Sequence, residues 1–550
     1  MTTATERIFA VRADELAPGS MREVPLSTKS DSPVNALVAN VHGKFYATSS
    51  RCTHYGMPLA RGVLTGDGRL YCPFHGACFR VTTGDIEDAP AINPLRQIPV
   101  SVEDGNVYLH VNLDELAKPV DGVCENPTET KHRTVIVGGG AVAINCAQEL
   151  RRNNYGGKIT IISAEPHAPI DRPKLSKGKL PPLEKLVVRD EAYIKDRLKV
   201  NLILKTRVFA IDTNLKRVSM QGKGVIEYDT LVLATGSIPR RLPIEGARLR
   251  GVHVMRTLAD AEEIHKSLQH RTQNVVVIGT GFIGLEMGMA YGKRANITLI
   301  GQTHVPLEGP LGREVGYGVQ TTMMNERPIK FLNAVDVVRI EPDAVGDGVS
   351  AVIVQPRARG APELTIPADM VLMSAGAIPA TDFLRNSPTF PPLRRDGSVE
   401  VDSALRVVGC ADVYAGGDIA AYPTANGVQR IEHWNVAANH GREIGRSIAT
   451  GQPRVFSHIP VFWSGLGSTM RYAGNGMGYD RVYIIGEPDE AEYSAFYGKD
   501  DKVIAISTMN TDPVMVQALA LMRAGRMPKL SEIASGTDIM KLDASSSVRL

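Results

Sequence analysis

The sequence predicts a multidomain protein: an all-β domain, then two interleaved doubly wound α/β (Rossmann-like) domains, then a small α+β domain. First, 550 residues are too many for one hydrophobic core. Second, short β-type runs separated by Gly, Pro and Asp turns fill the first 112 residues. Third, an apolar strand, a glycine turn and a helical repeat follow one another twice further on. The predicted domains are 1–115 (all-β), 116–132 (linker), 133–258 with 376–454 (first α/β domain), 259–375 (second α/β domain) and 455–550 (α+β).

The elements behind these boundaries can be read in chain order. The all-β domain contains the runs NALVANV, KFYATSS and NVYLHVNL, and the polar, proline-containing stretch KPVDGVCENPTETKHR reads as the linker. The first α/β unit opens with TVIVGGGAVAINCAQELRRN and continues to the strand KITIISAE. The second opens at Asn274 with NVVVIGTGFIGLEMGMAYGKR and continues to ITLIGQ. The last domain alternates RVYIIG, SAFYG and KVIAIST before the helical PVMVQALALMRAGR.

Two short Cys–His pairs stand in the all-β domain, Cys52-x-His54 and Cys72-x-x-His75. A Rieske-type [2Fe–2S] cluster needs two thiolates on one iron and two imidazoles on the other, and each pair supplies one of each from a loop tip. A zinc site is the alternative, but its ligands come as Cys–Cys and His–His pairs. The segments RCTHYGMPLARG and LYCPFHGACF resemble the Rieske family, so the sequence predicts these four residues as cluster ligands.

The same segments differ from those of the high-potential Rieske proteins. The resemblance implies that those proteins carry one further cysteine in each loop and that the two cysteines form a disulfide. Met57 and Phe74 stand at those positions, so no such disulfide forms. The resemblance therefore implies a low-potential, ferredoxin-like centre fed by reduced nucleotides. Cys78, just beyond the second loop, is predicted to be a packed thiol.

The first glycine fingerprint is Gly138-x-Gly140-x-x-Ala143, after a strand and before a helix. Such glycines permit a tight turn and close approach of a pyrophosphate, to which the helix N-terminus presents its amides. Glu165 closes the next strand, where an acid binds ribose hydroxyls. The pattern predicts a dinucleotide site.

Three later segments resemble FAD-binding reductases and predict FAD in this first site. Residues 231–236 read LVLATG, 413–418 read VYAGGD and 172–177 read RPKLSK. The cofactor-binding residues they add are Arg172, Lys177, Ala234, Thr235, Gly236 and Asp418, the last of which is expected on the ribityl chain. A thioredoxin-reductase-like site would need a Cys–Cys pair near the flavin, and Cys146 and Cys410 are isolated.

The second fingerprint, Gly279-x-Gly281-x-x-Gly284, is predicted to hold the nicotinamide nucleotide. The acid expected after the strand ITLI is replaced by Gly301 and Gln302. Without a carboxylate there, discrimination against a 2′-phosphate is weaker, and no arginine stands in its place. NADH is the expected coenzyme and NADPH stays open.

Together with EHW at 432–434 and FWSGLGSTMRYAG at 462–474, these motifs resemble the apoptosis-inducing-factor-like family over essentially the whole length, in its Rieske-bearing branch. The resemblance implies that Lys177 sits near the flavin N5 and pairs with Glu286, both counted as catalytic residues. It also implies that His433 and Trp434 lie against the isoalloxazine. An ammonium there would stabilise an anionic reduced flavin.

The expected function is an electron path from NAD(P)H through FAD to the Rieske cluster and on to an acceptor that the sequence does not identify. Two alternatives stay open: a redox-sensing signalling protein with little turnover, and a reductase component of an oxygenase or nitrite-reducing system.

Composition excludes some partners. A net charge of +3 over 550 residues gives no basic footprint for nucleic acid. No run of about 18 apolar residues predicts a transmembrane helix, and the six cysteines are read as metal ligands or free thiols rather than disulfides. The expected location is the cytoplasm, with mitochondrial association as the alternative that the family resemblance raises.

Overall fold

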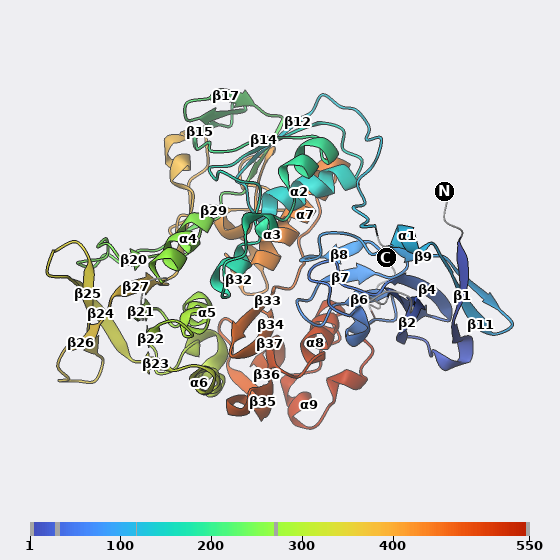
Figure 1. Cartoon of the computed structure of the whole chain (residues 1–550). Coiled ribbons are helices and arrows are strands. Elements are labelled where there is room, and N and C mark those ends of the chain that lie inside the picture. Colours follow the sequence, from blue (N-terminus) through green and yellow to red (C-terminus); the bar gives the residue numbers. More distant parts are fainter. Residues whose placement is uncertain (1–4, 28–33, 117, 269–272, 546–550) are drawn as a thin grey trace.

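The protein is described from a computed structural model that covers residues 5–27, 34–116, 118–268 and 273–545. The outer ends of the predicted first and last domains, 1–4 and 546–550, lie outside the described residues. In Figure 1 the blue N-terminal β domain and the yellow-green second α/β domain lie on opposite sides of the molecule. The first α/β domain lies above them, and the red C-terminal domain lies between them below.

The N-terminal domain is all-β, as predicted, apart from α1 (Leu113–Leu116) at its end. Its sheets have the strand orders β1-β11-β10, β2-β3-β4-β9 and β5-β6-β7-β8, all antiparallel. The strands are β1 (Glu6–Arg12), β2 (Met21–Ser27), β3 (Val34–Val41), β4 (Lys44–Ser49), β5 (Val63–Leu64), β6 (Arg69–Tyr71), β7 (Cys78–Arg80), β8 (Ile86–Asp88), β9 (Gln97–Ile98), β10 (Val100–Glu103) and β11 (Asn106–Val111). The two loops that carry the predicted cluster ligands follow β4 and β6.

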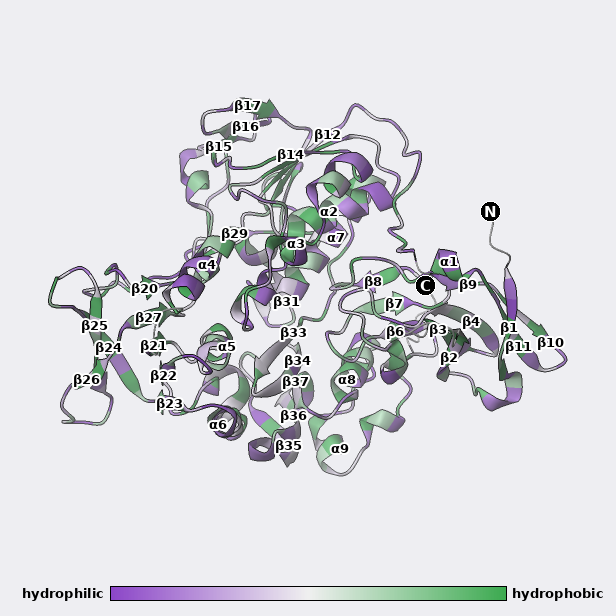
Figure 2. Cartoon of the chain, viewed as in Figure 1, coloured by the Kyte–Doolittle hydropathy of each residue, from purple (hydrophilic) through white to green (hydrophobic). Residues whose placement is uncertain are grey.

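The first α/β domain has a parallel sheet in the order β14-β13-β12-β18-β30, with α2 and α7 packed together on it. Its apolar strands are buried and appear green in Figure 2. The sheet is built from β12 (Arg133–Val137), β13 (Lys158–Ile162), β14 (Val200–Ile203), β18 (Thr230–Leu233) and β30 (Val413–Ala415), with α2 (Ala141–Arg152), α3 (Leu183–Leu186) and α7 (Trp434–Thr450). Smaller sheets join β15 (Val208–Asp212), β16 (Arg217–Met220) and β17 (Gly224–Glu227), then β19 (Ser237–Pro239) and β28 (Ala377–Pro379), then β29 (Val399–Glu400), β31 (Ala420–Thr424) and β32 (Gly427–Gln429).

The second α/β domain is inserted between β19 and β28, so the two domains interleave as predicted. Its parallel sheet has the order β20-β27-β21-β22-β23. The elements are β20 (Val252–His253), β21 (Asn274–Ile278), β22 (Asn296–Ile300), β23 (Ile329–Leu332), β27 (Met370–Met373), α4 (Leu258–Ser267), α5 (Phe282–Tyr291) and α6 (Glu308–Glu326), with the hairpin sheet β24 (Val335–Pro342), β25 (Val349–Pro356) and β26 (Leu364–Pro367). Because β20 pairs with β27, this sheet begins before residue 258, where the first domain was expected to end.

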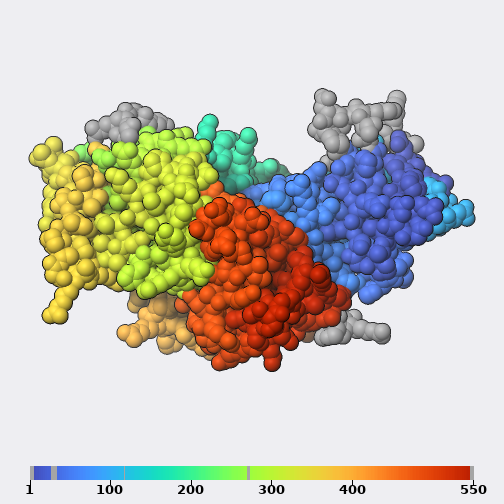
Figure 3. Space-filling view, turned by 90° about the horizontal axis from the view of Figure 1, so that it is seen from below, coloured from blue at the N-terminus to red at the C-terminus, as the bar shows by residue number. Residues whose placement is uncertain are grey.

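The C-terminal domain is an antiparallel sheet in the order β33-β34-β37-β36-β35, covered by α8. Its elements are β33 (Val461–Leu466), β34 (Ser468–Gly474), β35 (Arg481–Glu487), β36 (Glu492–Lys499), β37 (Lys502–Met509), α8 (Val514–Arg523) and α9 (Leu530–Ala534). Viewed from below, this domain lies between the N-terminal domain and the second α/β domain (Figure 3). It therefore contacts the elements that carry both kinds of predicted site.

The segment predicted as a linker is packed along the first α/β domain. Arg197 pairs with the Asp121 carboxylate at 2.7 Å, and Arg152 donates to the Asp121 carbonyl at 2.8 Å. Although burial opposes it, hydrogen bonding from Arg197 lowers the pKa of Asp121 to about 2. The connection between the domains is therefore held in place at this point.

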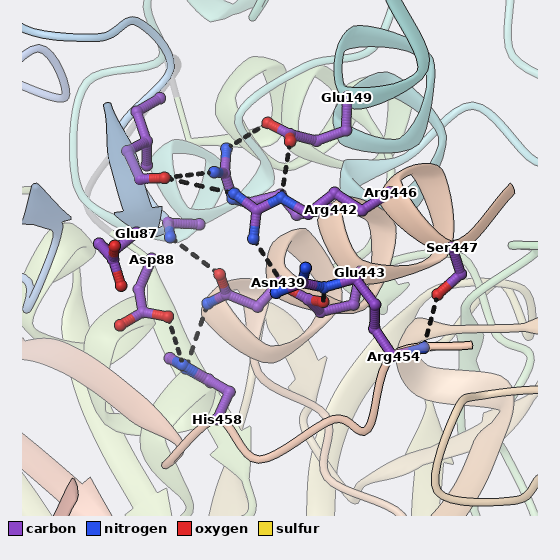
Figure 4. Close-up of polar contacts among 12 residues, drawn as sticks. Glu87, Asp88, Glu149, Asn439, Arg442, Glu443, Arg446, Ser447, Arg454 and His458 are labelled. Carbon is purple, nitrogen blue, oxygen red and sulfur yellow. Dashed lines mark hydrogen bonds and ion pairs between the residues drawn. The ribbon is translucent and has the colours of Figure 1, made fainter. Parts of the chain in front are cut away.

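A polar stripe on α7 docks the N-terminal domain onto the first α/β domain (Figure 4). Asn435, Asn439, Arg442 and Arg446 share one helix face because they are three or four residues apart. Asn435 donates to the Ala89 carbonyl at 2.7 Å, Asn439 accepts from the Ala89 amide at 2.9 Å, and Arg442 donates to the Ile86 carbonyl at 2.8 Å. The backbone that follows the cluster-binding loops is thus fixed to a helix of another domain.

Candidate functional site

The two cluster loops have the same backbone hydrogen bonds although their sequences differ. In the first, the Cys52 amide donates to the Met57 carbonyl at 2.8 Å and the Gly56 amide to the Cys52 carbonyl at 2.9 Å. In the second, Cys72 and Ala77 are joined at 2.8 Å and Gly76 and Cys72 at 3.1 Å in the same way. Both glycines have positive φ, +74° and +68°, which other residues adopt only with strain. The two loops therefore form a matched pair.

The four predicted ligands converge between these loops. The Nδ1 atoms of His54 and His75 lie 3.0 Å apart. The Cys52 and Cys72 thiols are joined by a hydrogen bond, which raises the pKa of Cys52 and lowers that of Cys72. Backbone amides also point at the sulfurs, those of residues 54 and 55 at Cys52 and those of residues 74 and 75 at Cys72.

This donor set fits a Rieske cluster: two sulfurs with amide donors on one side and two facing imidazole nitrogens on the other. Within the described ranges no three His, Cys, Asp or Glu side chains gather around one point as ligands for a single metal ion. Cys78 is fully buried with a free thiol, as predicted, and burial raises its pKa.

The histidine side of the site is covered by the C-terminal domain. The Trp463 ring lies 3.9 Å from the His75 ring and 5.5 Å from the His54 ring, centroid to centroid. His75 is only 9% exposed. On the other side Tyr55 stacks on His54 at 3.6 Å and donates its hydroxyl to the Asp171 carboxylate. Sequence reasoning missed both Trp463 and Tyr55, although Trp463 is one of only two tryptophans and lies in a segment quoted above.

The predicted FAD site has a glycine turn shaped for a dinucleotide. Gly138 has a φ of +122°, and a Cβ atom there would lie 2.1 Å from the Ala234 carbonyl oxygen. The first fingerprint is thereby packed against LVLATG. A Cβ on Gly140, in contrast, would meet nothing within 4 Å, so the space in front of α2 is open. Ala143, one turn further along α2, is fully buried. This cradle fits a pyrophosphate at a helix N-terminus.

A chain of polar contacts connects the other predicted FAD residues. Arg172 donates to the Glu165 carboxylate at 2.8 Å and to the Arg256 carbonyl at 2.9 Å. Arg256 in turn donates to the Asp418 carboxylate at 2.8 Å. Arg256 was missed, because its only sequence signal is its place just before α4.

The turn of LVLATG joins the same region. Thr235 donates to the Ala380 carbonyl at 2.8 Å, where the chain returns from the second α/β domain. A Cβ on Gly236 would lie 2.9 Å from the Arg256 guanidinium. Three of the residues predicted for FAD, namely Arg172, Gly236 and Asp418, thus lie next to Arg256.

Lys177 and Glu286, the two residues expected beside the flavin, are in contact. The Lys177 ammonium lies 2.8 Å from the Glu286 carboxylate, which is 6% exposed. Glu286 also accepts from Ser176 at 2.5 Å and from Ser464 of β33 at 2.7 Å. One buried carboxylate therefore joins RPKLSK, the helix of the second fingerprint and the C-terminal domain.

A cavity of about 630 Å³ lies between the start of α5, the C-terminal sheet and the segment that precedes α7. It is lined by Phe282, which directly follows Gly281, by His433, and by Phe462 and Tyr472 from the C-terminal sheet. Burial lowers the pKa of His433 to about 4, and its Nδ1 atom has no hydrogen-bond partner. A neutral, unpartnered imidazole at a cavity wall fits a ligand with polar ring edges. Trp434 begins α7 beside it and packs, half-buried, on the core of the first α/β domain.

The second fingerprint repeats the geometry of the first. A Cβ on Gly279 would lie 2.3 Å from the Ser374 carbonyl, and a Cβ on Gly284 would lie 2.0 Å from the Gly279 carbonyl. The space at Gly281, before α5, is open. This second cradle also fits a dinucleotide.

The sequence has no acid of its own at the end of β22, where one was expected. A carboxylate from another strand lies there instead. Gln302 donates to the Asp336 carboxylate of β24 at 2.7 Å, and Arg357 holds the same carboxylate with bonds of 2.7 and 2.9 Å. An acid and an arginine thus both stand beside Gln302. Neither was identified in sequence, since both lie more than thirty positions further along.

Comparison with known proteins is consistent over the whole chain. Residues 132–441 match the family described as "Pyridine nucleotide-disulphide oxidoreductase", residues 6–99 match "Rieske [2Fe-2S] domain", and residues 461–542 match "Reductase C-terminal". Apoptosis-inducing factor 3 of Homo sapiens is 31% identical over 531 residues, which cover 94% of this chain and 84% of that protein. Rhodocoxin reductase of Rhodococcus erythropolis is 31% identical and covers 74% of this chain and 92% of its own length.

Among solved structures, the covalent putidaredoxin reductase–putidaredoxin complex has a similar fold. It gives a TM-score of 0.69 at 25% identity and covers 76% of this chain and 100% of that chain. The fold class predicted from sequence is therefore confirmed. In the described part of the chain, no helix combines the length and apolar character needed to cross a membrane.

Proposed function

Since the chain belongs to the pyridine nucleotide-disulphide oxidoreductase family and carries a Rieske domain, we propose that it contains one electron path that passes strand β33. The flavin side of the path lies on one face of this strand and the cluster side on the other. The protein is an FAD-dependent NAD(P)H oxidoreductase with an iron–sulfur centre. Electrons pass from NAD(P)H through FAD to the Rieske cluster and on to an acceptor outside the chain.

We assign the following residues to each group, with the geometry of the loops and fingerprints as support. The cluster is held by Cys52, His54, Cys72 and His75, and the second fingerprint holds the nicotinamide nucleotide. FAD is held by the first fingerprint with Glu165, Arg172, Asp418 and Arg256. When bound, FAD supplies the conversion of a two-electron hydride transfer into the single-electron steps that a [2Fe–2S] cluster accepts. The polypeptide places the groups and excludes water between them.

The observation that carries the proposal is the alternation of side chains along β33. Phe462 lines the cavity beside His433, and Ser464 on the same face bonds Glu286, the partner of Lys177. Trp463 points to the opposite face and contacts His75 at 3.9 Å. A single strand therefore separates the nicotinamide–flavin side from the cluster side, and Trp463 fills the space next to the cluster.

The test is rapid anaerobic mixing of the purified holoprotein with NADH, with the flavin and cluster absorption bands followed separately. In the wild-type protein we expect the flavin bands to bleach first and the cluster bands to follow. Replacing Trp463 by leucine should slow cluster reduction about tenfold or more and leave flavin reduction unaltered, because electron transfer depends steeply on the placement of donor and acceptor.

Trp463→Phe is the matched control, since it keeps an aromatic ring against His75 and should be slowed much less than the leucine variant. A wild-type cluster that stays oxidised while the flavin is fully reduced would refute the electron path. A long-lived flavin–nicotinamide complex with almost no turnover on any acceptor would instead favour the redox-sensing role. The reductase-component alternative shares the path and differs only in the acceptor; relatives include the ferredoxin–NAD(+) reductase component of a biphenyl dioxygenase system.

Coenzyme choice is expected to favour NADH, because the Asp336 carboxylate beside Gln302 repels a 2′-phosphate and occupies Arg357. Asp336→Asn removes the repelling charge and frees the guanidinium. We expect the ratio of kcat/KM for NADPH to that for NADH to rise about fivefold, since one exposed charge contact is worth about 1 kcal/mol.

Asp347→Asn, in the turn at the other end of the same hairpin, is the control and should leave the ratio unaltered. An Asp336→Asn variant with the wild-type ratio would show that this carboxylate does not face the adenosine ribose.

We place this activity inside the cell, in the cytoplasm. The support is that all six cysteines are free, two of them being the cluster thiols. Association with mitochondria is the alternative suggested by the similarity to apoptosis-inducing factor 3.

A further inference from the structure

The second cluster loop is covered by the C-terminal domain rather than by solvent. A Cβ atom on Gly76 would lie 3.0 Å from the Val461 side chain and 3.5 Å from that of Leu519, so β33 and α8 pack directly on the loop. Arg471 of β34 reaches the same loop. Its Nε donates to the Phe74 carbonyl at 3.1 Å, and its guanidinium lies 5.1 Å from the centre of the Phe74 ring.

Arg471 is an unusual residue to find in this position, because it is only 3% exposed and carries its charge into an interface between domains. Its carboxylate partner is Asp512, at 2.9 Å. Asp512 lies at the solvent-exposed edge of the interface, and the desolvation that it undergoes there raises its pKa, although Arg471 opposes this. Among the ion pairs of the described residues, Arg471 is compensated by the Asp512 carboxylate alone.

The bond from Arg471 to the Phe74 carbonyl fixes the guanidinium at the middle of the second loop. Phe74 lies two residues after Cys72 and directly before His75. A fixed cation thus acts on a ligand to each iron of the predicted cluster.

We propose that Arg471 sets the reduction potential of the Rieske cluster from outside the Rieske domain, with Asp512 as the opposing charge. Reduction adds one electron, and hence one negative charge, to the cluster. A fixed cation in a poorly solvated interface stabilises that reduced form and raises the potential. Arg471 is a positioning residue in this role, since it acts through the loop whose backbone it binds at Phe74.

The proposal deepens the proposed function and rests on it for the source of the electron, which is NAD(P)H by way of FAD. It also means that the docking of the Rieske domain affects the reduction potential of the cluster. Because Arg471 belongs to the C-terminal domain, its charge acts on the cluster only while the loop is seated on β34. The driving force for cluster reduction is therefore greatest in the conformation in which Trp463 contacts His75.

The experiment is an anaerobic redox titration of the holoprotein with dithionite and mediators, in which the reduced cluster is followed by electron paramagnetic resonance. For Arg471→Gln we expect the ratio of reduced to oxidised cluster at a fixed applied potential to fall about tenfold, equivalent to about 59 mV for one electron. Asp512→Asn should raise the same ratio by a few-fold. Arg471→Lys keeps the charge and should restore most of the wild-type ratio.

A merely structural role would predict a different result, since all three variants would then shift the ratio together with the thermal unfolding temperature. Equal shifts for the glutamine and lysine variants, or shifts of the same sign for Arg471→Gln and Asp512→Asn, would overturn the proposal. If Arg471→Gln does not assemble a cluster, Asp512→Asn alone tests the proposal. An unaltered ratio of reduced to oxidised cluster in that variant would then overturn it. Dithionite delivers the electron without NADH, so failure of the NAD(P)H path leaves this test intact.

Discussion

Replacing Cys72 by serine should abolish electron delivery by the chain while NADH still bleaches the flavin. Cys72 is buried, its sulfur faces Cys52, and two backbone amides point at it. A serine cannot supply the thiolate that a [2Fe–2S] cluster requires, and the loop would lose one of two sulfurs on the same iron. Rapid anaerobic mixing should show flavin reduction without cluster bands, and turnover on any one-electron acceptor that needs the cluster should disappear.

Cys78→Ala is the matched control, because Cys78 is a buried free thiol in the same part of the domain. It should retain the cluster bands and lose at most some stability through the small cavity. Turnover that survives in Cys72→Ser at the wild-type rate would mean that the flavin reduces the acceptor directly. In that case the cluster would be a sensor beside the path rather than a step in it.

The two loops that carry the predicted cluster ligands could be identified from sequence because each loop is local in the chain. Six residues, from Cys52 to Met57 or from Cys72 to Ala77, contain the predicted ligands, the closing hydrogen bonds and the glycine with positive φ. The glycine fingerprints are equally local, since a strand, a turn and a helix N-terminus are consecutive in the chain. Patterns of this kind are visible in one sequence without knowledge of the tertiary packing.

The contacts between domains could not be predicted in this way. Trp463 meets His75 across 388 positions, and Tyr55 meets Asp171 across 116. No periodicity or motif encodes such pairs, which depend on how finished domains dock. For the same reason Asp336 was missed: its carboxylate lies beside Gln302 at the end of β22 but belongs to a separate hairpin.

The contact of Lys177 with Glu286 is an intermediate case. The resemblance to a known family, and not any local pattern, suggested the pair, and the structure brings the two side chains to 2.8 Å. What the family resemblance did not indicate is Ser464, which attaches the same carboxylate to β33. The link between the flavin side and the strand that carries Trp463 therefore came only from the three-dimensional arrangement.

One buried carboxylate, Glu149 of α2, pairs with the arginines of α7 that contact the Rieske domain (Figure 4). It pairs with Arg442 at 2.8 Å, with Arg446 at 2.9 Å and with Arg152 at 3.1 Å. Arg442 is 2% exposed, and burial lowers its pKa to about 10. Burial alone would raise the pKa of Glu149, but the arginine charges outweigh it and lower the pKa to about 2.

Replacing Glu149 by glutamine should therefore destabilise the protein by about 3–5 kcal/mol, the range for removing one partner of a buried ion pair. The amide keeps the shape of the side chain but leaves Arg442 buried without a counter-charge. Urea unfolding should show the loss, and proteolysis should cut the 116–132 segment sooner as the Rieske domain loosens. Glu443→Gln is the control: Glu443 of α7 pairs with the exposed Arg454, which lies beyond the helix, and with Arg446, which keeps Glu149 as its other partner. It should cost about 1 kcal/mol or less.

Acid titration is a second way to measure how much the Glu149 carboxylate stabilises the folded protein. The pKa of Glu149 is about 2 in the folded protein and about 4.5 when unperturbed, so its contribution to stability is complete above pH 4.5 and is lost as the pH falls through 2. That shift corresponds to about 3 kcal/mol, in agreement with the estimate for Glu149→Gln. The wild-type protein should lose more stability than Glu149→Gln between pH 4.5 and 2. Parallel pH profiles would mean that α7 holds the Rieske domain through Asn435 and Asn439 instead, because their amide bonds to Ala89 do not titrate.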